Sequence, residues 1–366
     1  MKKIAIITFV RERSPGAVLQ AYALQQFILK IQPKRVHVVD LDYSFKPLFD
    51  PKTKFVSLSK GIGAIRTLKG RICNPVHFRE CKAFVENNIA LSTKKYSCAN
   101  IQSANELYDI FIVGSDQVWN GRMTDNSFDD FLLTFCNRDK YSYAASFAKV
   151  EIFEQYKSKI LERLQSFKGI SLREPIGVTD IASNTRETPY VHIDPTLLLD
   201  GADYLKFIDK SLVPERKFIF VYTVAHHNKL LDFVRRAQKE TGYIVVYSTP
   251  YKESGLDDLP GIVRIKALHP KQFISLIANA ELVYTTSFHG TAFSILLKKN
   301  FFVEINCADG VNTRVKSLLE ILDLMERDIE RIDDSYTALS DYSTVFEKLQ
   351  NKREEAKQYL DGIIEN

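Results

Sequence analysis

Short apolar segments that read as β-strands alternate with helical segments, and the alternation begins again after Asp200. Such alternation favours parallel βαβ units. In the first half we expect strands over residues 3–10, 35–43, 108–114, 141–147, 170–173 and 190–193. In the second half we expect them over residues 217–224, 243–248, 262–266, 282–286 and 301–305. The pattern predicts an α/β fold of two doubly wound, Rossmann-like domains.

The chain length agrees with two domains, because 366 residues exceed one ordinary core. We expect an N-terminal domain over residues 1–200, a second domain over 201–335 and a final helical segment over 336–366. That segment has an apolar side, which predicts an amphipathic helix packing across both domains; its members are Val345, Phe346, Leu349, Ala356, Leu360 and Ile363. Residues 44–105 read mostly as helix and loop.

Composition excludes several classes of protein. The 45% of apolar and 26% of charged residues are normal for a soluble globular protein, and a net charge of +5 does not demand nucleic acid. Five irregularly spaced cysteines without C-x-x-C predict neither a disulfide framework nor a zinc site, and they favour the cytoplasm. No apolar run reaches about 18 residues, so no membrane span is predicted. The basic, apolar N-terminus reads as a first strand rather than a signal peptide.

In open α/β sheets ligands bind beyond the carboxyl ends of the strands. His289 and Gly290 lie where the strand before them gives way to a helix. Free N–H groups at a helix start attract anions and disfavour a positive charge on imidazole, which leaves it able to accept a proton. Ser287 and Thr291, both hydroxylated, flank this position. The segment therefore predicts acid/base chemistry beside a bound anion; the competing interpretation is a buried structural histidine.

The loop GSDQVWN, residues 114–120, follows another expected strand. Asp116, Gln117 and Asn120 supply hydrogen-bonding groups, and Trp119 offers a flat face. Polar groups beside an aromatic plane suit a sugar ring. The equal alternative is that Asp116 caps a helix and Trp119 lies in the core.

Three further strand ends carry candidate residues. After the first strand, Gly16 brings backbone close to a ligand and Gln20 lies on the following helix, unless this is a plain turn. Arg173 ends the strand at 170–172 and suits a carboxylate or phosphate, or else pairs with Glu174 or a neighbour. We interpret Asp194, with the Pro and Thr that follow it, mainly as a structural turn.

The remaining histidines do not predict a metal site. None forms an i, i+4 pair with a nearby carboxylate. At most one of the adjacent His226 and His227 is expected to be functional, and His37, His77, His192 and His269 are interpreted as structural.

Six motifs occur together in a fixed order between residues 16 and 302. They are GAVLQAYAL (16–24), VGSDQVWN (113–120), YAASF (143–147), ISLREP (170–175), HIDPTLLL (192–199) and TTSFHGTAFSILLKKNFF (285–302). On these motifs the chain resembles the polysaccharide pyruvyl transferase family.

The resemblance implies a GT-B-like fold and a reaction. Such enzymes move the enolpyruvyl unit of phosphoenolpyruvate onto a sugar as a cyclic ketal, commonly across the 4- and 6-hydroxyls of a hexose, and phosphate leaves. His289 matches the family histidine of the second domain, and Arg173 matches an arginine of the first. No cofactor is implied beyond phosphoenolpyruvate as co-substrate. We expect Asp116 to share the proton transfers with His289.

One departure affects donor binding. Members often have Arg-Leu-His where this chain has Ser287-Phe288-His289, and Arg314 or Lys316 is the expected substitute for the arginine. The predicted donor-binding set is Arg173, Ser287, Gly290, Thr291 and Arg314; the predicted acceptor-binding set is Gln117, Trp119, Asn120, Gly16 and Gln20. The acceptor is expected on a bacterial capsule or exopolysaccharide intermediate, lipid-linked at the inner face of the cytoplasmic membrane. Basic residues would aid that contact: Lys52, Lys54, Lys60, Arg66 and Lys69.

Two other functions stay open from the sequence. A GT-B-like glycosyltransferase would need an acidic residue for the ribose of a sugar nucleotide, and Glu304 is the candidate. A carbohydrate-binding relative without chemistry would explain the missing arginine at position 287.

Overall fold

A computed structural model describes residues 1–44, 75–225, 229–249, 255–256, 259–307, 310–332 and 341–365. The chain divides into two compact units: Met1–Ser171 with Gly177–Tyr190, and Leu172–Ile176 with Val191–Asn366. The second unit thus begins before the expected boundary at residue 200, and it includes Arg173, Asp194 and the C-terminal helix.

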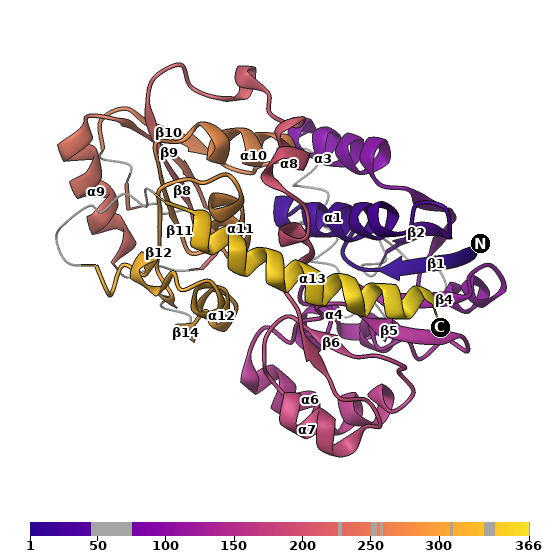
Figure 1. Cartoon of the computed structure of the whole chain (residues 1–366). Helices are drawn as coiled ribbons and strands as arrows, with labels where there is room; N and C mark the ends of the chain where they lie inside the picture. The colour runs from indigo at the N-terminus through magenta and orange to yellow at the C-terminus, as the bar shows by residue number, and fades with distance from the viewer. Residues whose placement is uncertain are drawn as a thin grey trace, which may run out of the picture. The chain divides into compact units, whose positions relative to one another are not determined.

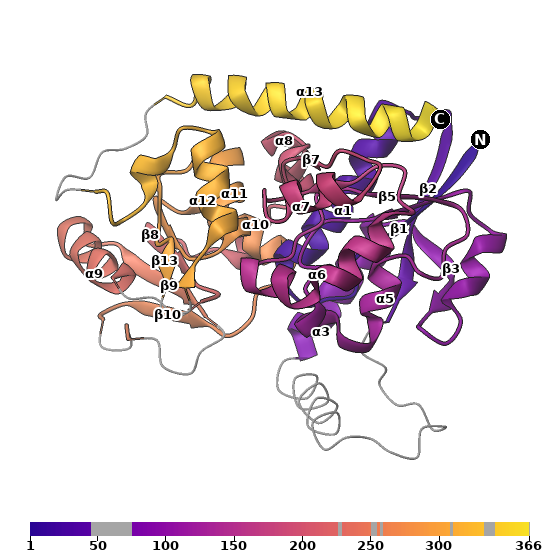
Figure 2. The ribbon, with the colours of Figure 1, turned by 90° about the horizontal axis from the view of Figure 1, so that it is seen from below.

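The first unit is built on a parallel five-stranded sheet of order β3-β2-β1-β4-β5 (Figure 1; β3 is labelled in Figure 2). Its strands are β1 Lys2–Ile7, β2 Val36–Tyr43, β3 Leu91–Tyr96, β4 Ile110–Val113 and β5 Asp139–Ser142. Its helices are α1 Pro15–Ile31, α3 Pro75–Asn88, α4 Gly121–Thr124, α5 Phe128–Phe131, α6 Val150–Leu164 and α7 Val178–Asn184. Every residue of β4 is buried, as expected of a parallel strand covered on both faces.

The second unit repeats the same strand order, as β10-β9-β8-β11-β12, and all pairs are parallel. Its strands are β8 Phe218–Tyr222, β9 Ile244–Ser248, β10 Ile262–Ile265, β11 Leu282–Thr285 and β12 Phe301–Val303. Its main helices are α8 Gly201–Leu205, α9 Leu230–Thr241, α10 Pro270–Asn279, α11 Phe288–Leu296, α12 Thr313–Ile321 and α13 Ser343–Glu365.

Alternating side chains of β8 explain the layers of the second unit. Ile219 and Val221 pack in a buried cluster with α9 residues such as Val234. Tyr222 faces the other way, with its ring 5.1 Å from that of Phe273 on α10. The period of two along a strand places α9 on one face of this sheet and α10 with α11 on the other, as Figure 1 shows.

Two short paired segments lie outside the main sheets. Strand β6 Ser171–Leu172 pairs with β7 Tyr190–Val191, and β13 Asn306–Cys307 forms an antiparallel pair with β14 Gly310–Val311. Helix α13 runs unbroken as the yellow ribbon of Figure 2. Its apolar side is buried as expected, except that Phe346 is half-buried. The predicted packing of α13 across both domains stays a prediction.

The expected strands are confirmed, with three differences. Strand β3, LSTKKY, lies in a region read as helix and loop; it is an edge strand with two lysines, and so carries little apolar pattern. Strand β5 ends at Ser142, and the chain beyond it turns through Ala144 at φ 47°. The pair β13–β14 was not expected. Among the described residues, no helix is both long and apolar enough to cross a membrane.

Candidate active site

Each of the two five-stranded sheets has its own topological switch point, where the strand order reverses. It lies between β1 and β4 in the first unit and between β8 and β11 in the second. Ligands of open α/β folds bind at that point, beyond the carboxyl ends of the strands. Residues 114–120 follow β4, and Thr286 to His289 follow β11. Both loops that we predicted to be functional therefore lie at equivalent places in their own units.

Helix α11 starts directly after β11 because small hydroxylated residues satisfy its first turn. Ser287 is the N-cap, and its Oγ accepts a hydrogen bond from the Gly290 N–H at 3.3 Å. The Thr291 hydroxyl donates to the Ser287 carbonyl at 3.0 Å. A Cβ at Gly290 would lie 2.4 Å from the Thr285 Oγ1, so only glycine fits without displacement. The sequence therefore turns from strand to helix within two residues.

The hydroxyl of Thr285 fixes this turn against the neighbouring strand. It donates to the Tyr222 carbonyl at 2.6 Å and accepts from the Ser287 N–H at 2.9 Å. One position on, the Thr286 Oγ1 accepts from the Val224 N–H at 3.0 Å. The ends of β8 and β11 are thus joined, and His289 is held at a defined place on the first turn of α11.

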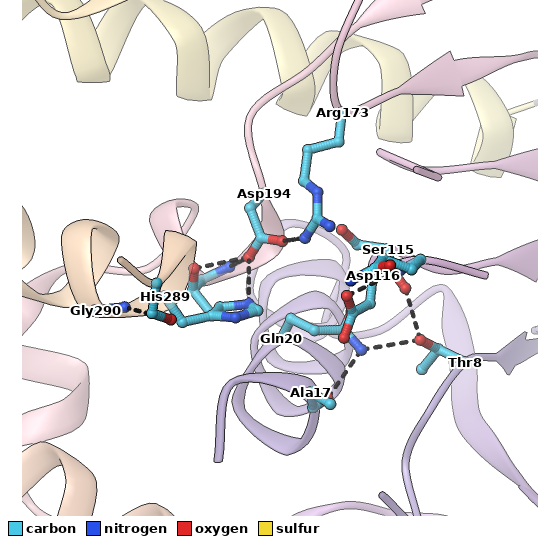
Figure 3. A network of polar contacts seen from close by, with 12 residues as sticks. Thr8, Ala17, Gln20, Ser115, Asp116, Arg173, Asp194, His289 and Gly290 are labelled. Carbon is cyan, nitrogen blue, oxygen red and sulfur yellow. Dashed lines mark hydrogen bonds and ion pairs between the residues drawn. The ribbon is translucent and has the colours of Figure 1, made fainter. Parts of the chain in front are cut away.

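Asp194 lies between Arg173 and His289 (Figure 3). Its Oδ2 accepts from the Arg173 Nη1 at 2.7 Å, and its Oδ1 lies 3.9 Å from the His289 Nε2. These three residues come from after β6, after β7 and from α11, all within the second unit. The arrangement joins a guanidinium, a carboxylate and an imidazole. The imidazole can act as an acid or a base, and the carboxylate is its counterion when it is protonated.

The carboxyl of Asp194 is held in its charged form. Complete burial alone would raise its pKa, but the charges of His289 and Arg173 and two hydrogen bonds from Thr196 outweigh burial and lower the pKa. The Thr196 N–H and hydroxyl donate to Oδ1 at 2.9 and 2.7 Å. Our interpretation of Asp194 as a structural turn was incomplete: it does cap the short helix after it, and it also pairs with two site residues. Its place directly after a strand, like that of Arg173, was the feature that pointed to it.

Arg173 is buried and contacts other side chains of the second unit. Its side chain is only 2% exposed, and its guanidinium lies 4.9 Å from the centre of the Phe288 ring and 3.9 Å from a Glu174 oxygen. Arg173 therefore pairs with neighbouring carboxylates, which was the alternative left open from the sequence. Asp194 is a closer partner than Glu174. A direct role in donor binding stays a prediction.

The other predicted donor residues have local partners. Ser287, Gly290 and Thr291 are buried, and the hydroxyls of Ser287 and Thr291 and the Gly290 N–H form hydrogen bonds within the first turn of α11. Arg314 is half-buried at the start of α12. The N-cap of α12, Asn312, donates to the Thr286 carbonyl at 3.1 Å, which brings the first turn of α12 next to the end of β11.

The loop after β4 in the first unit is strained at Asp116. Its φ of 74° is in the left-handed region, which residues other than glycine seldom occupy, and its Oδ1 accepts from the neighbouring Gln117 N–H at 2.9 Å. Asp116 does not cap α4, whose N-cap is Asn120. The Asn120 Nδ2 donates to the Gln117 Oε1 at 3.0 Å. Half-buried and polar, Asp116, Gln117 and Asn120 are placed together.

The prediction that Trp119 presents a face to a sugar is wrong. Trp119 is 0% exposed and its indole N–H donates to the Phe131 carbonyl at 2.9 Å. The rings of Phe147 and Phe167 lie 5.4 and 6.1 Å from it. The alternative interpretation, a core tryptophan, is the correct one, because the loop needs an apolar anchor beneath its polar residues.

Gln20 is likewise a structural residue of the first unit. It is fully buried, and its Nε2 donates to the Thr8 Oγ1 and the Ala17 carbonyl, each at 2.9 Å. Thr8 in turn donates to the Ser115 carbonyl at 2.9 Å, so the network joins α1 to the ends of β1 and β4 (Figure 3). Its amide nitrogen therefore does not point to an acceptor sugar. Gly16 is buried in the first turn of α1.

Glu304, which a glycosyltransferase would need to bind the ribose of a sugar nucleotide, instead accepts hydrogen bonds at the start of α9. Its two carboxylate oxygens accept from the Lys229 and Leu230 N–H groups at 3.1 and 2.9 Å, at the start of α9. A buried carboxylate at a helix N-terminus stabilises that helix and occupies the place an anion would take. His226, His227 and the five basic residues of the expected membrane contact lie outside the described residues. Among the described residues, no three His, Cys, Asp or Glu side chains gather as metal ligands would.

Known structures share this fold. A UDP-GlcNAc 2-epimerase from Neisseria meningitidis, solved with UDP-GlcNAc, aligns with TM-score 0.52 and 10% identity over 100% of this chain and 94% of its own. S. aureus MnaA, solved with UDP, aligns with TM-score 0.50 and 14% identity over 97% of this chain and 91% of its own. Two Rossmann-like units in one chain therefore define a GT-B-like α/β protein.

The family follows from the sequence. The family model of the polysaccharide pyruvyl transferases matches residues 15–306, and the chain belongs to this family. It is accordingly a transferase of polysaccharide biosynthesis. No curated protein matches the chain.

Proposed function

We propose that the protein transfers the enolpyruvyl group of phosphoenolpyruvate to a hexose of a bacterial surface-polysaccharide intermediate. The product is a cyclic pyruvate ketal across two hydroxyls of the hexose, the 4- and 6-hydroxyls, and phosphate is released. The observation that carries this proposal is the place of His289 on the first turn of α11, with Asp194 at 3.9 Å, in a chain of this family.

The chemistry requires one proton donor that recovers its proton. His289 gives a proton to C3 of phosphoenolpyruvate. The oxygen of the first sugar hydroxyl bonds to C2, and the proton of that hydroxyl returns to His289. The bond from C2 to the phosphate oxygen then breaks, and the second hydroxyl bonds to C2. Its proton leaves with hydrogen phosphate. The methylene has become a methyl group, so atoms and charges balance with the enzyme unchanged.

We assign the donor to the second unit. The start of α11 offers N–H groups to an anion, and the first turn of α12 lies beside it through Asn312. Because Arg173 is paired with Asp194, we propose Arg314 as the cation that meets the donor's phosphate or carboxylate. It takes the place of the arginine that relatives have at position 287.

We assign the acceptor to the loop after β4 of the first unit. Asp116 serves as the second acid/base group, and Gln117 with Asn120 binds sugar hydroxyls. The acceptor is carried on a lipid, so that a cytoplasmic enzyme works at the inner face of the membrane. Comparing co-sedimentation of the protein with liposomes containing or lacking anionic lipid tests that contact, and equal sedimentation would contradict it.

Turnover tests the function directly. The protein is incubated with phosphoenolpyruvate and a panel of hexosides, and inorganic phosphate is measured together with the mass of the hexoside. We expect phosphate release that depends on one acceptor class and is lost in His289→Ala. Turnover of UDP- or GDP-sugars without any use of phosphoenolpyruvate would contradict the proposal in favour of a glycosyltransferase.

Calorimetry with phosphoenolpyruvate alone separates donor binding from the chemical step. We expect Arg314→Ala to weaken binding at least about tenfold, as loss of one charge-assisted contact does. His289→Ala should retain most of the affinity. Lys239→Ala, an exposed cation in the last turn of α9 in the same unit, is the matched control and should bind as the wild type does.

A further inference from the structure

Within the second unit a buried carboxylate faces His289, and a guanidinium and a second carboxylate lie behind it. Asp194 lies 3.9 Å from the imidazole, Arg173 lies behind Asp194, and Glu174 lies 3.9 Å from Arg173. All three side chains are at most 2% exposed, so solvent screens their charges weakly. The carboxylate that faces the imidazole favours its protonated form.

We propose that Asp194 is a positioning residue that keeps His289 protonated, so that the imidazole meets the donor as an acid with its proton already in place. The proposal adds to the proposed function the direction of the first proton transfer, and it rests on that function for its chemical step. It also reverses the expectation from the sequence, in which the helix start alone would favour the neutral imidazole.

The geometry makes the effect of Asp194 on His289 electrostatic. A separation of 3.9 Å is too long for a hydrogen bond but within the range of an ion pair. The Oδ1 that faces His289 already accepts two hydrogen bonds, both from Thr196. Thr196 and Arg173 thus hold the carboxylate from both oxygens, and the carboxylate acts on the imidazole through its charge.

Magnitudes decide between the two opposing influences. A helix N-terminus changes the ratio of charged to neutral side chain by roughly a few-fold. An opposite charge at about this distance changes that ratio by roughly tenfold to a thousandfold. Arg173 offsets part of the effect of Asp194, yet Asp194 lies between Arg173 and His289 (Figure 3). Phosphoenolpyruvate, with its carboxylate and phosphate, adds further negative charge and acts in the same direction.

The first measurement needs neither donor nor acceptor. Nitrogen-15 NMR of histidine-labelled protein reports the imidazolium-to-imidazole ratio of each histidine, and His289→Gln assigns the His289 signals. We expect that ratio to fall at least about tenfold at pH 7 in Asp194→Asn. Because Asp194→Asn leaves Arg173 buried without its carboxylate, the double variant Arg173→Gln with Asp194→Asn is measured as well. It removes both charges of the pair, and the ratio should again be lower than in Arg173→Gln alone.

The control is a second buried carboxylate of the same unit. Glu304→Gln removes a charge at the start of α9 and should leave the His289 ratio unchanged. An unchanged ratio in folded Asp194→Asn and in the double variant would overturn the proposal. This outcome is independent of whether phosphoenolpyruvate is the donor, so it is distinguishable from a failure of the proposed function.

A kinetic measurement separates positioning from a general loss of structure. With phosphoenolpyruvate and an acceptor in hand, we expect Asp194→Asn to lower kcat at least about tenfold with less than about threefold change in the KM for phosphoenolpyruvate. Formate added to Asp194→Ala should restore part of kcat, because it returns a carboxylate to the space. A rise in KM alone, an unchanged kcat in Asp194→Asn, or a lowered kcat of Asp194→Ala that formate does not raise would contradict a role in proton transfer.

Discussion

The loops that follow β4 and β11 occupy the same topological position in two sheets of the same strand order, yet they differ in chemistry. Each is tied across the switch point by a threonine hydroxyl: Thr8 donates to Ser115, and Thr285 donates to Tyr222. After this shared hydrogen bond the two loops differ. The first continues as an irregular turn with a strained Asp116, whereas the second leads directly into helix α11. The first thus presents a carboxyl with two amide groups, which we propose bind the sugar, and the second an imidazole with a carboxylate and a guanidinium, which we propose carry the proton transfer.

The largest effect should come from His289. If the second loop carries the proton transfer, His289→Gln will lower kcat by about a thousandfold, the usual size of general acid catalysis, with little change in melting temperature. Phosphate release from phosphoenolpyruvate measures it. His192→Phe removes another buried histidine of the same unit and should retain most of the activity. Comparable losses in both variants would remove the distinction that we draw for the second loop.

The next largest effect tests how α13 supports the segment that follows Asp194 in the second unit. The Arg353 guanidinium is buried and donates to the Leu197 and Leu199 carbonyls at 2.7 and 2.6 Å and to the Asp200 Oδ1 at 2.5 Å. Arg353→Met leaves two buried carbonyls unsatisfied, and we expect it to lower the free energy of unfolding by about 2–4 kcal/mol. Denaturant unfolding measures this.

Lys352 is the control for that variant. Its neighbouring ion pair with Glu355 is exposed, so Lys352→Ala should cost less than about 1 kcal/mol. Equal stability of Arg353→Met and the wild type would mean that α13 does not hold the segment that follows Asp194.

Opposite pH responses distinguish the two units. Burial lowers the pKa of His192 to about 4 from 6.5, so its contribution to stability is complete above pH 6.5 and is lost as the pH falls toward 4, by about 3 kcal/mol at most. Burial raises the pKa of Asp40 in β2 well above 3.8, so its contribution is complete below that value and is lost as the pH rises. We expect His192→Phe to flatten the stability profile between pH 4 and 6.5, and Asp40→Asn to increase stability at pH 8.

Unfolding free energies from pH 4 to 8 test both signs. The Asp40 carboxyl accepts from the Gln25 Nε2 at 2.7 Å, and the asparagine oxygen retains this hydrogen bond. A wild-type profile that Asp40→Asn leaves unchanged at pH 8 would show that burial of this carboxyl has little cost.

The smallest effect compares two glycines at the equivalent turns. A Cβ at Gly290 would lie 2.4 Å from the Thr285 Oγ1, while one at Gly114 would lie 3.0 Å from the Thr8 Cβ. We expect Gly290→Ala to cost about 2 kcal/mol of unfolding free energy and Gly114→Ala about 1 kcal/mol, since overpacking scales with the displacement required. Thermal unfolding of the two variants measures the difference. The reverse order would mean that the first turn, not the second, is the more tightly built.

Much of the architecture was predictable because apolar strands and their helices carry clear periodicities. Strand β3 was not, because an edge strand has one free side and tolerates Lys94 and Lys95. The loop after β4 was located correctly, but burial of Trp119 depends on Phe147 and Phe167, which are distant in the sequence. Likewise, His289 was predicted from its place at a helix start. Its pairing with Asp194 was not, since Asp194 follows β7 of the small β6–β7 pair and His289 follows β11 of the main sheet, and the two meet only in the folded unit.

Hydrogen exchange with phosphoenolpyruvate tests most directly the central claim that the donor binds at the charged loop of the second unit. Exchange is measured by mass spectrometry with and without donor, so no acceptor is needed. We predict protection in peptides covering residues 286–292 and 310–316, and its loss in Arg314→Ala. Protection confined to residues 114–120, or none at saturating phosphoenolpyruvate, would contradict the account.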